Sequence, residues 1–430
     1  QLFGDLNPVT ARAMEILSEL LGFVPKVLKS VKTSEYRKLY RDVIIKVTKP
    51  IIDVVINVEN VAENAKDFQH NLIRIGISYD LVYSCLHTGE WHAVPAEQRE
   101  VFTLLSFLRI IYMLICGKGR PETLNDAIYI ADMGLMLGAK VFVEHDGKDL
   151  DLLAEVVSIL AKANKPDLSS GPPLKRLKVD IDDSSKAVCE VPILNQPTLE
   201  YFGSHHYDIR EPALLEGIIE DWPALERWHD PNYLIAAAGE RTVPVEVGSQ
   251  YSSDDWSQRL VKFKDFIAQH LTEESGTKSV DTEQDRAYLA QHELFDQIPA
   301  LREDIRVPDY IGRTDTNPRI KAWLGPKGTV SPLHTDPGHN LLCQVFGSKT
   351  IILAPPDSTP NLYPHEHFIL NNTSQIVDAK AIDYERFPRA REVRFRRLEL
   401  RRGQVLYIPP GWWHYVESLA PSFSVSFWFD

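Results

Sequence analysis

The sequence of 430 residues contains little cysteine. Its four cysteines lie far apart, and no two of them form a Cys-x-x-Cys pair: Cys85, Cys116, Cys189 and Cys343. A disulfide framework or a zinc knuckle requires closely grouped cysteines, so this spacing argues against both. The chain is therefore expected to work in a reducing compartment.

The chain also has fewer basic than acidic residues. The chain has 47 lysines and arginines against 60 aspartates and glutamates, which gives a formal net charge of −13 at pH 7. Proteins that bind nucleic acid through its phosphates usually carry an excess of basic residues. We therefore expect no direct binding to nucleic acid.

A long apolar run is missing as well. The longest one extends from Leu104 to Cys116 and is interrupted by Arg109, whereas a membrane-spanning helix needs about 20 apolar residues. No signal-peptide pattern is visible, although a signal ahead of Gln1 would not be seen in this sequence. We expect no association with a membrane.

The composition that remains is that of a folded protein with more than one domain. With 44% hydrophobic and 25% charged residues, wholesale disorder is excluded, and the length suggests two domains.

Residues 1–165 show apolar residues at helical spacing, most clearly at Val101, Leu104, Leu108 and Ile111. No repeat period was found, so we predict an irregular all-α domain, which we expect to bind another protein.

Residues 166–195 read as a linker. They are rich in proline, glycine, serine and charge, and they lack apolar periodicity. A short basic cluster at Lys175, Arg176 and Lys178 fits a nuclear localisation signal, and it fits a solvated linker equally well. The expected location is the nucleus, with the cytoplasm as a second one.

The last region, residues 196–430, changes character along its length. Helical stretches are predicted up to about Leu301, and from Ile320 onward short apolar runs separated by Gly, Pro and Asn favour a β-sandwich or barrel over residues 320–430. Leu341–Phe346 and Lys349–Leu353 flank Gly347-Ser348, which predicts a β-hairpin. The predicted class is therefore α+β, with an all-α domain followed by a β-rich one.

The residues with the clearest chemical meaning are His334 and Asp336. On an extended chain, side chains two residues apart point to the same side, so both can bind one ion. His414, on another predicted strand, would complete a two-histidine, one-carboxylate triad of the kind that leaves positions open on Fe(II).

Other histidines offer competing ligands. His339 could replace His334, and His365-Glu366-His367 repeats the two-residue spacing in a loop, where ligands are held less rigidly than on strands. His205 and His206 precede the β-rich part and look like surface residues.

A lysine near the predicted triad suggests a co-substrate. A metal-chelating oxo-acid such as 2-oxoglutarate has a second carboxylate, which needs a positive partner once it is buried. Lys349, at the start of the predicted hairpin's second strand, can supply that charge. Tyr288, Ser331 and Asn340 can supply further hydrogen bonds.

At this point the sequence resembles a known family. Residues 196–430 are similar to the Jumonji-C (JmjC) family, whose members are 2-oxoglutarate- and Fe(II)-dependent oxygenases built on a double-stranded β-helix of the cupin or jelly-roll type. The segments that carry the resemblance are Val243–Gly248, Tyr288–His292, Ala322–Pro326, Ser331–Pro337, Asn371–Gln375 and Phe423–Trp428.

The resemblance implies a role for each candidate residue. It implies that His334, Asp336 and His414 bind Fe(II), with O2 as the second co-substrate. It implies that 2-oxoglutarate is held by Tyr288, Ser331, Asn340, Lys349 and Trp428. It further implies that Glu246 pairs with a substrate guanidinium and that Trp323 lines the same substrate pocket.

The implied reaction is hydroxylation of an arginine side-chain carbon in a protein or peptide, with succinate and CO2 as co-products. Asp336 and Glu246 favour it, because family members with Asp at the second ligand position are more often hydroxylases. The alternatives are demethylation of methyl-lysine in a histone tail, a non-catalytic chromatin scaffold, and a peptidase acting near modified arginines. The peptidase lacks support from an HExxH motif.

One segment departs from the resemblance. Residues 386–402 contain eight arginines: Arg386, Arg389, Arg391, Arg394, Arg396, Arg397, Arg401 and Arg402. Such a segment is either an anion-binding face or a solvated edge strand whose charges prevent aggregation.

Overall fold

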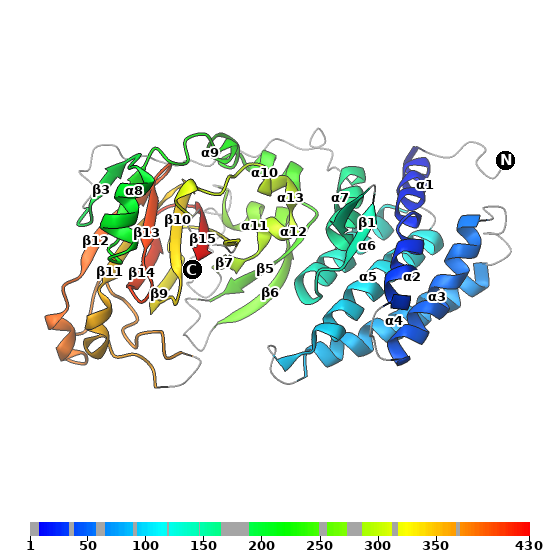
Figure 1. Ribbon diagram of the computed structural model, residues 1–430, viewed down its shortest axis with the longest axis horizontal. Helices are drawn as coiled ribbons and strands as arrows, with labels where there is room; N and C mark the ends of the chain where they lie inside the picture. The colour runs from blue at the N-terminus through cyan, green and yellow to red at the C-terminus, as the bar shows by residue number, and fades with distance from the viewer. Residues whose placement is uncertain are drawn as a thin grey trace. The chain divides into compact units, whose positions relative to one another are not determined.

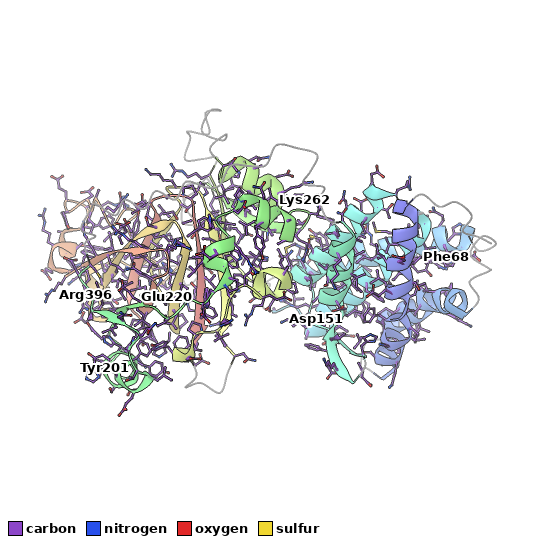
Figure 2. All side chains as sticks on the ribbon, turned by 90° about the horizontal axis from the view of Figure 1, so that it is seen from above. Phe68, Asp151, Tyr201, Glu220, Lys262 and Arg396 are labelled. Carbon is purple, nitrogen blue, oxygen red and sulfur yellow. The ribbon has the colours of Figure 1, made fainter. Side chains whose placement is uncertain are left out.

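A computed structural model describes most of the chain. The described residues are 8–33, 38–56, 65–88, 93–117, 120–145, 147–164, 189–248, 256–272, 286–311, 317–366 and 370–430. The basic cluster at 175–178 and His367 lie outside these ranges. The chain divides into two compact units, Gln1–Asp167 with Glu240–Thr242, and Leu168–Gly239 with Val243–Asp430. Figure 2 labels Phe68 and Asp151 in the first unit, and Glu220 and Arg396 in the second.

The first unit is built of helices around one apolar core. Helix α5 is its centre: the core residues Leu104, Leu108 and Ile111 are fully buried, and α4 and α6 pack against α5. The helices are α1 (Pro8–Leu21), α2 (Val24–Thr33), α3 (Lys38–Ile56), α4 (Ala65–Leu86), α5 (Ala96–Gly117), α6 (Pro121–Leu137) and α7 (Leu152–Ala163) (Figure 1). The apolar spacing of this region therefore predicted helices correctly.

A small hairpin between α6 and α7 was not predicted. Strand β1 (Phe142–His145) pairs antiparallel with β2 (Lys148–Asp151), and the last helix of the unit begins directly after it, at Leu152. Asp151 ends the hairpin and caps the helix, because its carboxylate accepts a hydrogen bond from the backbone N–H of Ala154 at 3.5 Å. Strands of four residues are too short to show a clear two-residue period.

Helix α5 corrects one part of the membrane argument. The helix has 22 residues, and by length and composition it could cross a bilayer, so the reasoning from a short apolar run was wrong. Most of the helix is nevertheless buried inside the unit, with Phe107, Ile110 and Tyr112 fully enclosed by other side chains. A buried core helix passes the same test, and the helix is therefore weak evidence for a membrane span.

The second unit contains two facing sheets. A nine-stranded sheet has the order β3-β4-β13-β10-β15-β8-β7-β5-β6, and a four-stranded sheet has the order β12-β11-β14-β9. The strands are β3 (Ile193–Asn195), β4 (Ala213–Glu216), β5 (Thr242–Val247), β6 (Ser257–Lys262), β7 (Ala287–His292), β8 (Arg319–Gly325), β9 (Val330–Thr335), β10 (His339–Phe346), β11 (Ser348–Ala354), β12 (Arg396–Arg401), β13 (Val405–Ile408), β14 (Trp413–Ser418) and β15 (Ser422–Phe429). A helical region followed by a sheet-rich cupin-type domain confirms the predicted fold class.

Strands also occur where helices were expected. Before Leu301 the chain forms β3 to β7 in addition to short helices. These helices are α8 (Leu199–Phe202), α9 (Pro223–Arg227), α10 (Pro231–Ala238), α11 (Phe263–His270), α12 (Leu294–Gln297) and α13 (Pro299–Arg302). Figure 1 shows α10 to α13 beside β5 to β7. Strands of three to six residues between such helices are too short to show a clear two-residue period.

The predicted hairpin over Leu341–Leu353 is wrong. Strand β10 pairs with β13 and β15, while β11 pairs with β12 and β14. The two strands are consecutive in sequence but belong to different sheets. Gly347 makes the change of sheet possible, because it adopts φ +73° and a Cβ there would lie 2.3 Å from the carbonyl oxygen of Pro421.

An apolar layer fills much of the space between the sheets. It combines side chains of the nine-stranded sheet, such as Leu342 and Ile408, with Ile351, Leu353 and Val416 of the four-stranded sheet. Since the polar candidates of both sheets point into the same space, this arrangement decides which of them meet.

Candidate metal and co-substrate site

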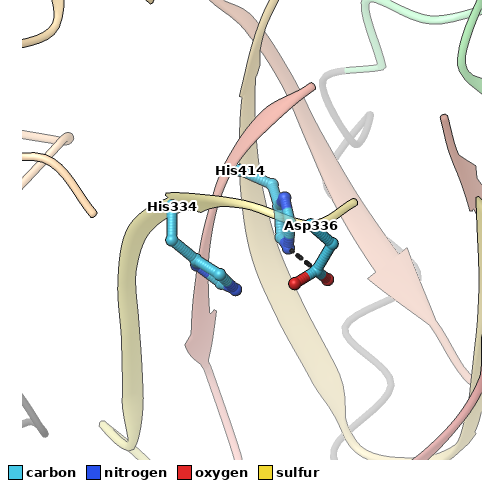
Figure 3. Close-up of side chains that lie close together, drawn as sticks. All are labelled: His334, Asp336 and His414. Carbon is cyan, nitrogen blue, oxygen red and sulfur yellow. Dashed lines mark ion pairs between the residues drawn. The ribbon is translucent and has the colours of Figure 1, made fainter. Parts of the chain in front are cut away.

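The three predicted metal ligands come together on the four-stranded sheet. His334 on β9 lies directly opposite His414 on the neighbouring antiparallel strand β14, and Asp336 follows β9 by one residue. One ligand atom from each lies within 4.8 Å of the other two (Figure 3). Within the described ranges, no other group of histidine, cysteine or carboxylate side chains meets this condition.

Each histidine is oriented by a carbonyl two residues earlier in the chain. Nδ1 of His334 lies 2.7 Å from the oxygen of Pro332, and Nδ1 of His414 lies 3.1 Å from the oxygen of Trp412. A carbonyl only accepts, so Nδ1 carries a proton, and the neutral form of each ring then has its lone pair on Nε2. This is the tautomer that binds a metal through Nε2.

The protonation of the site also suits a metal. Burial and the neighbouring His334 lower the pKa of His414 to about 4, against the opposing effect of Asp336. The ring of His414 is therefore neutral at pH 7. Its Nε2 lies 3.6 Å from Oδ2 of Asp336, so a lone pair and a carboxylate face the same point.

Trp428 touches the carboxylate ligand, a contact that the sequence did not suggest. Its Nε1 donates a hydrogen bond to Oδ2 of Asp336 at 3.1 Å. The predicted role of Trp428 was to hold 2-oxoglutarate, and it does line the same cavity. The alternation of Ser424, Ser426 and Trp428 along β15 would have placed all three on one face, but not toward Asp336.

This contact leads to a prediction for Trp428→Phe. Phenylalanine keeps the aromatic wall and removes the N–H donor, so the Asp336 carboxylate loses its orientation. Loss of such an outer hydrogen bond typically weakens metal binding about 10- to 100-fold. Titration with Mn(II), followed by electron paramagnetic resonance, measures this change. An affinity equal to that of the wild type would show that Trp428 does not position the ligand.

The triad opens into a partly open cavity. Its lining includes all predicted metal and co-substrate residues together with Trp323, and an apolar wall of Leu342, Ile408 and Val416.

Lys349 is the most unusual side chain of this cavity. It is 1% exposed, and among the described residues its ammonium group has no carboxylate within 4.0 Å. Its hydrogen-bond partner is the hydroxyl of Tyr288 at 3.1 Å. Burial lowers the pKa of Lys349 to about 7. A buried ammonium of this kind is costly unless an anion joins it.

The side-chain oxygen of Asn340 is a polar group of the cavity without a hydrogen bond among the described residues. This oxygen is buried, and Asn340 is 4% exposed. Ser331 interacts with the hydroxyl of Tyr288, and burial raises the pKa of that phenol well above its usual range. The cavity thus offers one cation and several neutral hydrogen-bonding groups, but no buried anion beside the cation.

The residues present fit both expected groups. Two imidazoles and one carboxylate converge as in a facial Fe(II) triad, and the buried ammonium of Lys349 lines the same cavity. A dicarboxylic oxo-acid bound at the metal would satisfy Lys349 and reach the amide of Asn340.

The two predicted substrate residues are placed differently. Trp323 is 8% exposed, lines the cavity, and donates through Nε1 to the hydroxyl of Ser426 at 2.9 Å. Glu246 does not line the cavity. It lies on β5 opposite Tyr288 of β7, one strand away from the cavity wall.

The competing histidines lie apart from the triad. His339 precedes Asn340 on β10 and therefore faces the other side of the sheet, where Nδ1 is 2.8 Å from the hydroxyl of Tyr407 and the ring stacks on Tyr207. His365 is absent from the cavity lining. His205 stacks on Tyr201 and is exposed, whereas His206 is buried at 4% exposure and was wrongly assigned to the surface.

His339 predicts a loss of stability in acid. Burial, with a smaller effect of Arg210, lowers its pKa to about 4, from 6.5 in the unfolded chain. Between these values the unfolded chain binds more protons, so the free energy of unfolding falls as the pH decreases from 6.5 toward 4. From pH 7 to pH 5 the loss is about 2 kcal/mol.

Urea unfolding of the wild type and of His339→Phe at both pH values measures this loss. The variant cannot titrate at this position, so its stability should decrease less over the same pH range. Equal losses in both proteins would exclude His339 as the source.

Comparison with known proteins agrees with this geometry. The Cupin-like domain family matches residues 198–430. Jumonji C domain-containing protein 5 of Drosophila melanogaster is 44% identical over 365 residues, covering 83% of this chain and 86% of its own length. The chain belongs to the Jumonji-C family. Lysine-specific demethylase 8 of Danio rerio is 39% identical and covers 83% of this chain and 87% of its own length. Lysine-specific demethylase JMJ30 of Arabidopsis thaliana is 36% identical and covers 82% of this chain and 84% of its own length.

Membership of the Jumonji-C family fixes the type of chemistry. The Jumonji-C enzymes are 2-oxoglutarate-dependent oxygenases that use Fe(II) and O2, and the His334, Asp336 and His414 group has the composition that such a centre needs. This chain is accordingly an enzyme with Fe(II), 2-oxoglutarate and O2 as its cofactor and co-substrates.

Proposed function

We propose that the enzyme hydroxylates a carbon of an arginine side chain in a protein or peptide. The observation that carries this proposal is Glu246. Burial raises the pKa of its carboxyl group, against an opposing hydrogen bond with Trp256, and no described cation pairs with it. A carboxylate in this position gains a partner when a substrate guanidinium approaches.

The position of Glu246 fits such a role. Its strand β5 pairs with β7 at Tyr288, and Tyr288 forms part of the cavity wall beside Trp323, with ring centres 6.0 Å apart. A guanidinium held by Glu246 could therefore extend its alkyl stem along the Trp323 indole toward the triad. A lysine could pair with the same carboxylate but lacks the two-pronged geometry of a guanidinium.

Each group of residues in the site has its own role. When bound, Fe(II) and O2 supply the oxidising power that converts a substrate C–H to C–OH while 2-oxoglutarate becomes succinate and CO2. We assign His334, Asp336 and His414 to holding the metal. Lys349, with Tyr288, Ser331 and Asn340, anchors the far carboxylate, and the apolar wall keeps water away from the reacting carbon.

Mass spectrometry of peptides tests the proposed reaction. The enzyme with Fe(II) and 2-oxoglutarate is incubated with an arginine peptide and with the same peptide carrying N-methyl-lysine. We expect one added oxygen atom on arginine and no change on methyl-lysine. Loss of the methyl group as formaldehyde would instead identify a demethylase, and peptide cleavage without 2-oxoglutarate would identify a peptidase.

Glu246→Gln separates recognition from chemistry in the same assay. The amide keeps the size of the side chain and removes its charge, so KM for the arginine peptide should rise at least about tenfold. Formation of succinate without peptide should stay unchanged. An unaltered KM would remove the basis for arginine recognition.

The second candidate function is demethylation of methyl-lysine. Its support comes from relatives, since two similar proteins bear the name lysine-specific demethylase. The chemistry up to the attack on the C–H bond is shared, and the carbon that faces the metal decides the product.

We also propose that the enzyme acts in the nucleus. The support is the basic cluster Lys175, Arg176 and Lys178 between the two domains. A fluorescent fusion of the full chain should accumulate in nuclei, and replacement of all three residues by alanine should distribute it through the cell. Nuclear accumulation of the triple variant would show that the cluster is not the signal.

A further inference from the structure

The arginine-rich segment contains two kinds of arginine. Three form ion pairs: Arg396 with Glu211, Arg401 with Glu399, and Arg402 with Glu226. Five others are exposed, and none of them has an ion pair with a described carboxylate: Arg386, Arg389, Arg391, Arg394 and Arg397. We call these five residues the arginine face. The ion-paired arginines are explained by the fold, but the arginine face is not.

Three members of the arginine face are held against aromatic rings. The guanidinium carbon of Arg386 is 5.0 Å from the ring centre of Phe387, that of Arg389 is 4.5 Å from Tyr363, and that of Arg391 is 4.9 Å from Tyr384. A guanidinium supported by a ring has less rotational freedom, so less entropy is lost when it binds an anion. These arginines are pre-arranged.

The segment beneath the arginine face is firmly anchored. Phe387 and Ala390 are 6% and 1% exposed and belong to an apolar cluster, in which the Phe387 ring meets the edge of Tyr363 at 5.1 Å. The Asp383 carboxylate accepts backbone hydrogen bonds from residues 385 and 386 at 3.0 and 3.1 Å. The arginine face is therefore part of the fold and not a loose tail.

The apolar cluster also shows where the arginine face lies relative to the active site. Leu333 and Trp413 precede His334 and His414 on their strands, so they point to the opposite side of the four-stranded sheet. Leu333 and Trp413 pack in the same cluster as Phe387. The arginine face thus covers the outer side of the sheet whose inner side carries the metal ligands, and it is not part of the substrate cavity. Arg396, one of the ion-paired arginines of the same segment, is labelled in Figure 2.

The chemistry of the arginine face calls for an anionic partner. Guanidinium groups match carboxylates in a two-pronged geometry, and Arg389 already lowers the pKa of the Tyr363 phenol, against the effect of desolvation. A nucleic acid would extend beyond this segment over a protein with a formal net charge of −13, which would repel its phosphates. A short acidic stretch of a protein needs only the arginine face itself.

We propose that the arginine face is a docking surface for an Asp/Glu-rich segment of a partner protein. Several carboxylates of one segment meet several pre-arranged guanidiniums, while the exposed ring of Tyr384 contacts the backbone or apolar side chains between them. This proposal does not depend on the reaction that the enzyme catalyses, because the surface lies behind the metal-bearing sheet.

Fluorescence anisotropy with the full chain and a labelled oligoglutamate peptide tests the proposal. The variant Arg386→Glu/Arg389→Glu/Arg391→Glu should weaken binding at least about tenfold, because three exposed cations are replaced by anions that repel the peptide. A control with equal charge change, Lys49→Glu/Arg319→Glu/Lys327→Glu, replaces exposed bases outside the arginine face. The control should bind within about twofold of the wild type.

Two further measurements make the outcome decisive. Thermal unfolding verifies that both triple variants fold. The variant Arg386→Lys/Arg389→Lys/Arg391→Lys keeps the charge without the planar guanidinium. Its affinity should lie between that of the wild type and that of the charge-reversal variant. Equal weakening by the control would reduce the effect to net charge and overturn the proposal. Tighter binding of a single-stranded RNA with the same number of charges would overturn it in favour of a nucleic acid.

Discussion

Replacement of His414 by alanine is expected to abolish turnover of 2-oxoglutarate. His414 supplies one of three converging ligand atoms, and its Nε2 lies 3.6 Å from the Asp336 carboxylate. Without His414 only His334 and Asp336 remain, and two ligands cannot fix the coordination geometry of the metal. A bound metal typically contributes several kcal/mol to such reactions, so succinate formation should fall about a thousandfold or more.

A matched control distinguishes ligand loss from general damage. His365→Ala removes a histidine of the same unit that does not line the cavity, and it should retain turnover within about twofold. Thermal unfolding of both variants shows whether they fold. A His414→Ala protein that is folded and still binds Mn(II) with the affinity of the wild type would contradict the assignment of this ligand.

Lys349→Met is expected to weaken binding of 2-oxoglutarate and to stabilise the protein without ligand. Binding of 2-oxoglutarate should weaken at least about thirtyfold, because the far carboxylate loses its buried partner. The protein without ligand should become more stable, by about 1–4 kcal/mol, because a buried ammonium with no anionic partner is replaced by an apolar chain of similar length. Calorimetric titration and urea unfolding measure the two effects separately.

The pKa of Lys349 makes the same interaction visible as proton uptake. The pKa of Lys349 is about 7 in the folded protein and about 10.4 in the unfolded chain. Between these values the unfolded chain binds more protons, so the contribution of this group to the free energy of unfolding rises with pH and is lowest below pH 7. At pH 8 most of the lysine is neutral, and a bound carboxylate restores its charge. Binding should therefore take up protons, with an upper limit of about one per molecule.

Calorimetry in buffers of different ionisation enthalpy measures this uptake, with Mn(II) in place of Fe(II). Lys349→Arg serves as the control, because a guanidinium remains charged throughout. The control should show no uptake from this position, whatever its affinity. Uptake of the same size in the arginine variant would assign the proton to another group.

The candidate metal-binding residues were predictable because their signal is local. The spacing of His334 and Asp336 requires only an extended chain, and this chain is indeed extended there. The pairing with His414 needed two further conditions, a second strand and the correct register, and the structure meets both. The resemblance to the Jumonji-C family supplied what spacing alone could not.

The fold around the ligands was less predictable. Lys349 was linked to the site through a hairpin that does not exist, and it reaches the cavity because β10 and β11 lie in facing sheets. A sequence shows where a chain turns at Gly347 but not which strand each neighbour joins, since that depends on contacts with distant residues. The same holds for the hydrogen bond between Trp428 and Asp336, which joins residues far apart in sequence.

The most direct test of the site is a crystal structure of the enzyme with Mn(II) and 2-oxoglutarate, prepared without O2. Anomalous scattering should place one manganese ion in contact with Nε2 of His334, Nε2 of His414 and the carboxylate of Asp336. The carboxylate of 2-oxoglutarate that is far from the metal should contact Nζ of Lys349. Manganese bound elsewhere, or a co-substrate whose far carboxylate avoids Lys349, would contradict the proposed active site.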